Sequence, residues 1–339
     1  MYSLIRRLLF HLEPEVAHHL TLCVIRVAGN FPIMPALLRR AYRAPAKPVH
    51  AFGLQFNNPV GLAAGYDKDG LGWRGLACLG FGHIEVGTVT PKPQPGNPKP
   101  RVFRLPDEKA LINRMGFPGD GAQVVAQRLG TRKPNGLVIG VNIGKNIDTP
   151  LDSAEQDYVY LVRLFAPLAD YLAINVSSPN TVGLRRLQGR EMLESLLKAL
   201  AQERSCQEQK CGKKLPMLVK LAPDLSDEEL DDALGAIDST GMDGVIATNT
   251  TLNRDGINSP VAQEAGGLSG APLTLRSRAM VSKIAQRNGN RLPVVGVGGI
   301  MTPGDAQAML DAGASLVQIY TGLIYGGPGL VQRIVKEVE

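Results

Sequence analysis

The stretch NVSSPN at positions 175–180 carries the clearest candidates for chemistry in the sequence. Its two serines and two asparagines directly follow the apolar run at 171–174. Ser, Asn and Pro also form ordinary turns, so the stretch alone favours a turn over a reactive serine. Similar polar groups follow other short apolar runs. They are Lys68, Thr88, Asn142, Lys220, Thr248, Asn249, Thr250, Tyr320 and Thr321. Whether these side chains form one site depends on the elements that position them.

Those elements follow a regular pattern from residue 50 onward, where short apolar runs alternate with helical stretches. The runs of strand length cover 59–66, 83–89, 137–144, 171–177, 217–222, 244–250, 293–299 and 316–322. Continuous apolar runs suit parallel strands covered on both faces, and the intervening helices imply crossover connections. The pattern predicts an α/β protein with a closed (β/α)8 TIM barrel, preceded by a small hairpin over 49–59.

In such a barrel the active site forms at the carboxyl ends of the strands, which is where the polar residues stand. Glycine-rich turns after the seventh and eighth strands, GVGG at 296–299 and YTG at 320–322, favour a phosphate site. The amides and two lysines of the other strands suit a flat heterocycle with several carbonyl and N–H groups. Because no dinucleotide fingerprint follows the first strand, a mononucleotide flavin fits best.

Two other readings of single residues stay open at this point. Lys220 lies inside an apolar strand, in inward phase, and could form a Schiff base as in barrel aldolases. His18 and His19 lie on a predicted helix, where solvated or core-satisfied histidines are more common than functional ones.

The composition and charge of the chain argue against a nucleic-acid-binding protein and against a metal site. The chain has 339 residues, 44% of them hydrophobic, and a net charge of +6. Residues 1–48 hold seven of the basic residues and only two acidic ones, so the excess charge belongs to one short segment. Basic and aromatic residues are not interleaved, which argues against nucleic acid as a partner. The four cysteines lack zinc spacing, and no histidine or carboxylate cluster indicates a metal site.

The basic N-terminal segment predicts two amphipathic helices. Apolar residues recur at helical spacing from Leu4 to Leu12, and Pro14 stands in the first turn of a second helix that ends at Gly29-Asn30. Neither helix is a continuous apolar span of about 20 residues, so neither is expected to cross a bilayer. Residues 1–45 could lie in a membrane interface or pack on the main domain as a helical lid, and the pattern alone favours neither.

Ten motifs, in order from about residue 45 to 335, resemble the dihydroorotate dehydrogenase family. They are GLAAGYDKDG, EVGTVTPKPQPGNPKPRVFRL, INRMGFPGDG, VNIGKN, INVSSPNTVGLRRLQG, VKLAPDLS, IATNTT, GGLSGAPL, VGVGGI and LVQIYTGLIYGGPGL. The serine in NVSSPN and the helical N-terminus resemble the quinone-dependent, membrane-associated class (class 2), since the soluble classes typically have cysteine at the position of the base.

The resemblance implies a role for each matching residue. Flavin mononucleotide (FMN) would be bound by Ala64, Gly65, Lys68, Thr88, Asn142, Asn175, Lys220, Thr248, Gly270, Gly299, Tyr320 and Thr321. Dihydroorotate would be bound by Lys68, Asn113, Arg114, Met115, Gly116, Phe117, Asn175, Asn180, Asn249 and Thr250. Ser178 would be the catalytic base, and the quinone side would be lined by His18, Arg104 and Tyr320.

The same resemblance implies the function and the organisation of the chain. Dihydroorotate would be oxidised to orotate in pyrimidine biosynthesis, with FMN as hydride acceptor and a ubiquinone-type quinone as final oxidant. Residues 1–45 would form the quinone tunnel and membrane contact, and residues 46–339 the FMN-binding barrel. The protein would be a monomer, peripheral on the cytoplasmic face of a bacterial inner membrane. Residues 180–190 would form a lid with Gly183 and Gly189 as hinges.

Alternatives remain beside the resemblance. A related FMN barrel with a soluble electron acceptor would not need residues 1–45 for its activity. An aldolase using Lys220 would carry no flavin. A non-catalytic barrel that only binds membranes would not explain the many polar residues at the carboxyl ends of the strands.

Overall fold

The computed structural model describes residues 2–131, 133–134, 136–181, 183–289 and 291–339, and its centre is a closed eight-stranded parallel barrel. The order around the barrel is β10-β12-β13-β3-β4-β7-β8-β9, so strands consecutive in the barrel pattern are neighbours. The barrel strands are β3 (Val60–Leu62), β4 (His83–Val89), β7 (Val138–Ile143), β8 (Tyr171–Asn175), β9 (Met217–Leu221), β10 (Gly244–Ala247), β12 (Val294–Val297) and β13 (Leu316–Ile319). All eight lie within the predicted runs, and the predicted (β/α)8 fold is confirmed.

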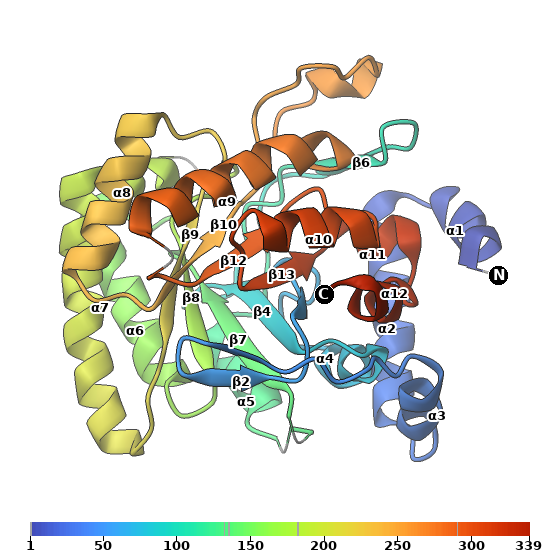
Figure 1. Ribbon diagram of the computed structural model, residues 1–339, viewed down its shortest axis with the longest axis horizontal. Helices are drawn as coiled ribbons and strands as arrows, with labels where there is room; N and C mark the ends of the chain where they lie inside the picture. The colour runs from blue at the N-terminus through green and yellow to red at the C-terminus, as the bar shows by residue number, and fades with distance from the viewer. Residues whose placement is uncertain (1, 132, 135, 182, 290) are drawn as a thin grey trace.

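Helices cover the outside of the barrel, as Figure 1 shows. They are α4 (Trp73–Leu76), α5 (Ala122–Leu129), α6 (Ala154–Phe165), α7 (Arg190–Cys211), α8 (Asp227–Ser239), α9 (Thr274–Asn288), α10 (Pro303–Asp311), α11 (Thr321–Gly326) and α12 (Leu330–Glu337). The polar stretch 200–215 is helical as far as Cys211, after which Gly212 adopts the left-handed conformation that ends a helix.

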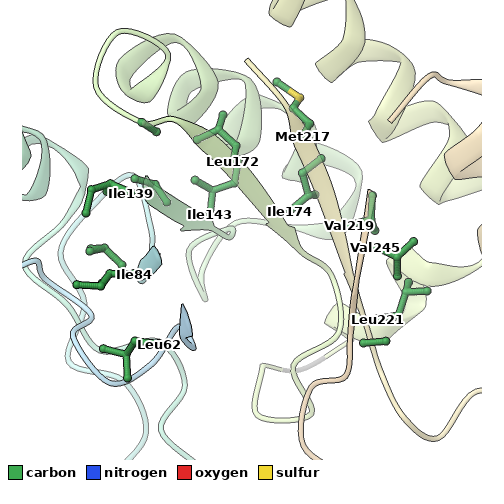
Figure 2. Close-up of a cluster of buried hydrophobic side chains, with 14 of the residues drawn as sticks. Leu62, Ile84, Ile139, Ile143, Leu172, Ile174, Met217, Val219, Leu221 and Val245 are labelled. Carbon is green, nitrogen blue, oxygen red and sulfur yellow. The ribbon is translucent and has the colours of Figure 1, made fainter. Parts of the chain in front are cut away.

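Alternating strand residues contribute to two separate cores. Met217, Val219 and Leu221 belong to the cluster between strands and helices, part of which Figure 2 shows. Leu218 has the opposite phase and belongs to a second cluster, together with Tyr171 of β8. Because side chains alternate between the faces of a strand, Lys220 shares the inward phase of Leu218, as the sequence predicted.

The predicted hairpin forms from β1 (Val49–Ala51) and β2 (Leu54–Phe56), and its Phe56 is fully buried in the inner cluster. A further sheet was not predicted. Its antiparallel strands are β5 (Val102–Leu105), β6 (Ala110–Asn113) and β11 (Gly267–Gly270), in the order β11-β6-β5. This sheet brings Asn113 and Gly270 to the region above the barrel.

The N-terminal segment holds three helices, α1 (Tyr2–Phe10), α2 (Pro14–Asn30) and α3 (Met34–Ala41), of which the third was not predicted. They lie at one side of the barrel, and α6 to α8 lie at the other (Figure 1). The hydroxyl of Tyr2 donates to the carbonyl of Ile324 at 2.6 Å, and Arg6 donates to the carbonyl of Tyr325 at 2.8 Å, so α1 is anchored on α11.

These helices expose an unusual set of large apolar side chains. The set is Leu4, Ile5, Leu8, Leu12, Val16, Leu20, Val24, Val27, Phe31, Ile33, Met34 and Leu37. Leu8 is 72% exposed, although burying such a side chain is worth about 1.5–3 kcal/mol. Among the described residues no single helix is long and apolar enough to cross a membrane; α2 and α3 reach that length only as a pair, bent by 109°.

Candidate active site

A cavity of about 1010 Å³, part of it open to solvent, lies at the carboxyl ends of the barrel strands. Most of the residues implied in flavin or substrate binding line it. These are Ala64, Gly65, Lys68, Thr88, Asn113, Met115, Gly116, Phe117, Asn175, Asn180, Lys220, Thr248, Asn249, Thr250, Gly270, Gly299, Tyr320 and Thr321, and Ser178 lines it too. Two implied residues, Asn142 and Arg114, do not line the cavity.

Asn142 lies directly behind the cavity wall and orients residues that do line it. Its side-chain oxygen accepts hydrogen bonds from the Thr88 hydroxyl at 2.5 Å and from the Asn175 amide at 3.1 Å. Its amide nitrogen donates to Glu85 at 2.8 Å. This bond orients the amide so that its oxygen faces Thr88 and Asn175. Asn142 therefore supports the site by orienting Thr88 and Asn175, without lining the cavity itself.

Glu85, which was not among the sequence candidates, organises the base of this wall. The side chain is fully buried on β4 and accepts hydrogen bonds from the hydroxyl of Tyr171 at 3.0 Å and the amide of Gln318 at 2.8 Å. The Lys220 ammonium lies 3.7 Å from Glu85 Oε1. A buried charge needs such partners because burial of an unpaired ion is costly. Glu85 is therefore the acidic partner of Lys220 at the cavity wall.

The glycine-rich turns bring backbone close to one side of the cavity. Gly299 has φ +74°, and a Cβ there would lie 2.3 Å from backbone atoms of Thr274, so only glycine fits. Thr321 begins α11, and its hydroxyl is 2.9 Å from the hydroxyl of Ser269. Gly298, from the predicted phosphate turn, also lines the cavity, as does Ser269, which was not a sequence candidate. Backbone N–H groups at turns and helix starts suit a phosphate.

The two serines of NVSSPN have different surroundings. Ser178 lines the cavity, is 5% exposed, and its oxygen accepts a hydrogen bond from the backbone N–H of Asn180 at 3.2 Å. Ser177 is fully buried outside the lining, where its hydroxyl accepts from the Asn249 amide at 3.0 Å. Ser178 is thus the serine with access to a bound molecule.

Two asparagines from different segments, Asn113 and Asn180, meet at the cavity wall. The Asn180 amide donates to Asn113 Oδ1 at 3.1 Å, while the buried Asn180 Oδ1 has no hydrogen-bond partner in the described residues. Such an acceptor indicates a ligand with an N–H group, because buried polar atoms are normally paired. Nearby, burial lowers the pKa of Lys68, and the charges of Asp69 and Glu15 partly counter this effect.

The side chain of Arg114 is directed to other partners. Its guanidinium forms an ion pair with Glu264 and donates to the carbonyl of Pro100 at 2.9 Å. It also lies 4.6 Å from the ring centre of Phe103. Arg114 therefore holds the segments around the cavity together.

A second cavity, of about 840 Å³, lies between α1, α2 and the barrel. His18, Arg104 and Tyr320 line it, as the resemblance implied. The His18 ring packs edge-on to Tyr66 at 5.2 Å; burial, with the positive charges of Lys68 and His19, lowers its pKa to about 3. The His18 imidazole is therefore neutral at neutral pH.

The two cavities share part of their walls. Lys68, Asn113, Met115, Ser269 and Tyr320 line both. The two cavities are therefore adjacent, and these five residues form the wall between them.

The predicted lid contains the short helix η3 (Leu184–Gln188), flanked by Gly183 with φ +71° and by the extended Gly189. Val182, also in the predicted lid, lies outside the described residues. Arg185 ties the segment down by donating to the carbonyl of Ser177 at 3.1 Å and pairing with Asp224 at 3.0 Å. No group of three metal-ligating side chains occurs among the residues described.

Comparison with known proteins identifies close relatives. The dihydroorotate dehydrogenase family model matches residues 48–339. A dihydroorotate dehydrogenase (quinone) of Acidithiobacillus ferrooxidans is 50% identical, covering 99% of this chain and 94% of that protein. The corresponding protein of Alkalilimnicola ehrlichii is 49% identical, covering 100% and 99%. Among solved structures, ligand-free dihydroorotate dehydrogenase of Eimeria tenella has a TM-score of 0.85 and 42% identity, covering 96% of this chain and 93% of that one.

Proposed function

This chain belongs to the dihydroorotate dehydrogenase family, and we propose that its two cavities serve the two half-reactions of a quinone-dependent member. The enzyme oxidises dihydroorotate to orotate in pyrimidine biosynthesis and passes the electrons to a quinone. The observation that carries this proposal is the pair of cavities with a common wall. One holds the polar groups that a pyrimidine needs, and the other opens between amphipathic helices.

The residues at the barrel mouth fit flavin mononucleotide. Lys220, paired with Glu85, would stabilise negative charge on the flavin's pyrimidine edge, and Thr88 and Asn175 would bind its polar atoms. The glycine turns at 298–299 and 320–322 would bind the phosphate. When bound, the flavin accepts a hydride from the substrate and releases the electrons to the quinone.

The remaining chemistry belongs to side chains of this protein. Lys68 would pair with the substrate carboxylate, and Asn113, Asn180 and Asn249 would hold the ring, with Asn180 Oδ1 accepting from a ring N–H. Positioning of this kind can contribute several kcal/mol, at best about 7–11, to lowering the barrier. As the hydride leaves C6, the proton of C5 would pass to Ser178 and on to water.

Ser178 is a weak base, and its surroundings compensate for this. The buried serine is only 5% exposed, and the predicted lid 180–190 would exclude bulk water from the proton's path. The backbone N–H of Asn180 donates to the serine oxygen, which favours a developing negative charge on it.

The N-terminal residues 1–45 would contact the membrane and enclose the quinone passage, with 46–339 as the catalytic barrel. The exposed apolar side chains of α1 to α3 support this, since soluble proteins rarely gather such residues in one segment. The enzyme would be a peripheral monomer on the cytoplasmic face of the bacterial inner membrane, the side on which cytosolic dihydroorotate is available.

Anaerobic mixing with dihydroorotate tests the proposal. The expected result is loss of the flavin absorbance near 450 nm, followed by its recovery when a short-chain ubiquinone is added. Absence of bleaching would refute the proposed chemistry. Bleaching without recovery by the quinone would refute the quinone assignment alone. Deletion of 1–45 should abolish recovery and leave bleaching intact.

A further inference from the structure

A groove lies between the end of α2 and the segment that leads into α4, outside both cavities described above. Three arginines line it, Arg26, Arg74 and Arg128, together with the apolar side chains of Val27 and Phe31. No acidic side chain is among the described residues that form its wall. None of the residues proposed to bind flavin, dihydroorotate or quinone belongs to it. The groove therefore needs a separate explanation.

Close packing of the two helices sets the positions of its arginines. A Cβ at Gly29 would lie 2.4 Å from the backbone nitrogen of Gly75, so α2 and α4 touch backbone to backbone. Arg74 is thereby brought beside α2, where its guanidinium donates to Asn30 Oδ1 at 3.1 Å. It also lies 5.3 Å from the ring centre of the buried Trp73. Arg74 is thus held in place without a carboxylate partner among the described residues.

The other two arginines differ in how they are held. Arg128 donates to the backbone carbonyl of Asp69 at 3.0 Å and pairs with Asp120 at 2.7 Å, so its charge is largely compensated. The Arg26 side chain is exposed, and its guanidinium forms no hydrogen bond or ion pair with any described residue. The groove consequently carries about two uncompensated positive charges, from Arg26 and Arg74.

The groove opens at the edge of an apolar stripe. Val16, Leu20, Val24, Val27 and Phe31 follow one another at intervals of three or four residues and are each more than half exposed, except Leu20 at 49%. Val27 and Phe31 belong to both the stripe and the groove. If the stripe enters a bilayer, the two guanidinium groups without acidic partners stand at the depth of the lipid headgroups.

We propose that this groove binds the phosphodiester of one anionic phospholipid, such as phosphatidylglycerol. Arg26 and Arg74 donate to the phosphate oxygens, for which a guanidinium is geometrically suited, and the acyl chains continue along Val27 and Phe31. The inference rests on the proposed membrane contact of residues 1–45 and adds a specific lipid to it.

The test uses the full-length, flavin-loaded enzyme and a monomeric lipid. Dihexanoyl-phosphatidylglycerol below its micelle concentration should bind saturably with one site per chain, measured by isothermal titration calorimetry. Arg26→Gln and Arg74→Gln should each weaken binding about fivefold. Arg40→Gln removes an equal charge from the exposed surface of α3, outside the groove, and should leave the affinity unchanged. Dihexanoyl-phosphatidylcholine and inorganic phosphate, at matched concentrations, should bind more weakly.

Three results would overturn the proposal: no saturable binding of the anionic lipid, equal weakening by Arg40→Gln, or equal binding of inorganic phosphate. The second would indicate diffuse electrostatic attraction, and the third a general anion site. If Arg74→Gln does not fold, the exposed Arg26→Gln still decides the question. Reduction of the flavin by dihydroorotate does not depend on this groove, so a failure of the proposed catalytic function would be recognised separately.

Discussion

Replacement of Glu85 by glutamine is the sharpest test of how the cavity wall is built. The carboxylate accepts hydrogen bonds from Asn142, Tyr171 and Gln318 and lies 3.7 Å from the Lys220 ammonium. Glutamine offers one oxygen and would direct an NH2 group at donors. Removing one partner of a buried ion pair costs about 3–5 kcal/mol. Because hydrogen bonds to charged groups are also lost, we expect the free energy of unfolding to fall by at least about 3 kcal/mol.

The measurement is urea unfolding of the purified variant, together with its flavin content. Glu155→Gln, at an exposed position on α6, is the matched control and should change stability by no more than about 0.5 kcal/mol. A Lys220→Met variant completes a double-mutant cycle, in which the combined loss should be smaller than the sum of the single losses. A loss below about 1 kcal/mol for Glu85→Gln, or additive losses in the cycle, would contradict the reasoning.

Three further predictions concern single residues. Ser178→Ala should slow flavin reduction by dihydroorotate at least about a hundredfold in stopped-flow absorbance, and Ser177→Ala should slow it far less; equal effects would show that the assignment of the base is wrong. For Glu15, burial raises the pKa, but the hydrogen bond and charge of Arg101 outweigh this and the pKa lies below its usual value. The stability that the pair adds is therefore present above the unfolded pKa of 4.5 and lost as pH falls through the lower folded value. The stability gap to Glu15→Gln should accordingly narrow in acid unfolding followed by circular dichroism, whereas a constant gap would contradict the linkage. Finally, burial, with nearby positive charges, lowers the pKa of His18 to about 3. We therefore expect that His18 causes no inflection near pH 6.5 in the pH profile of quinone reduction. An inflection near pH 6.5 that is lost in His18→Asn would contradict this.

The barrel was predictable from sequence because parallel strands are buried on both faces and therefore read as unbroken apolar runs. The site was predictable for a related reason. Lys220 has the phase of Leu218, so an inward lysine in an apolar strand could be inferred before any coordinates were considered. Glu85 carried the same kind of signal, as the one carboxylate in the run HIEVGTV, and could have been found by the same phase argument.

Other features depend on contacts that a local pattern does not contain. Strand β11 pairs with β6 across more than 150 residues, and both strands are only four residues long. Their pairing is decided by the tertiary structure above the barrel. Helix α3 did carry local signals, Pro35 in its first turn and apolar residues at helical spacing from Met34 to Ala41, but it is only eight residues long and buries none of them fully.

The anchoring of α1 on α11 has a consequence for how the chain is made. The hydrogen-bond acceptors of Tyr2 and Arg6 lie 322 and 319 residues further along the chain. During synthesis the first helix therefore leaves the ribosome long before its binding surface exists. The apolar residues of α1 therefore remain without their packing partner, exposed or bound to a chaperone, until the last barrel unit has emerged and folded. Only a completed barrel can hold α1 in its final position, so a prematurely terminated chain would lack this anchoring.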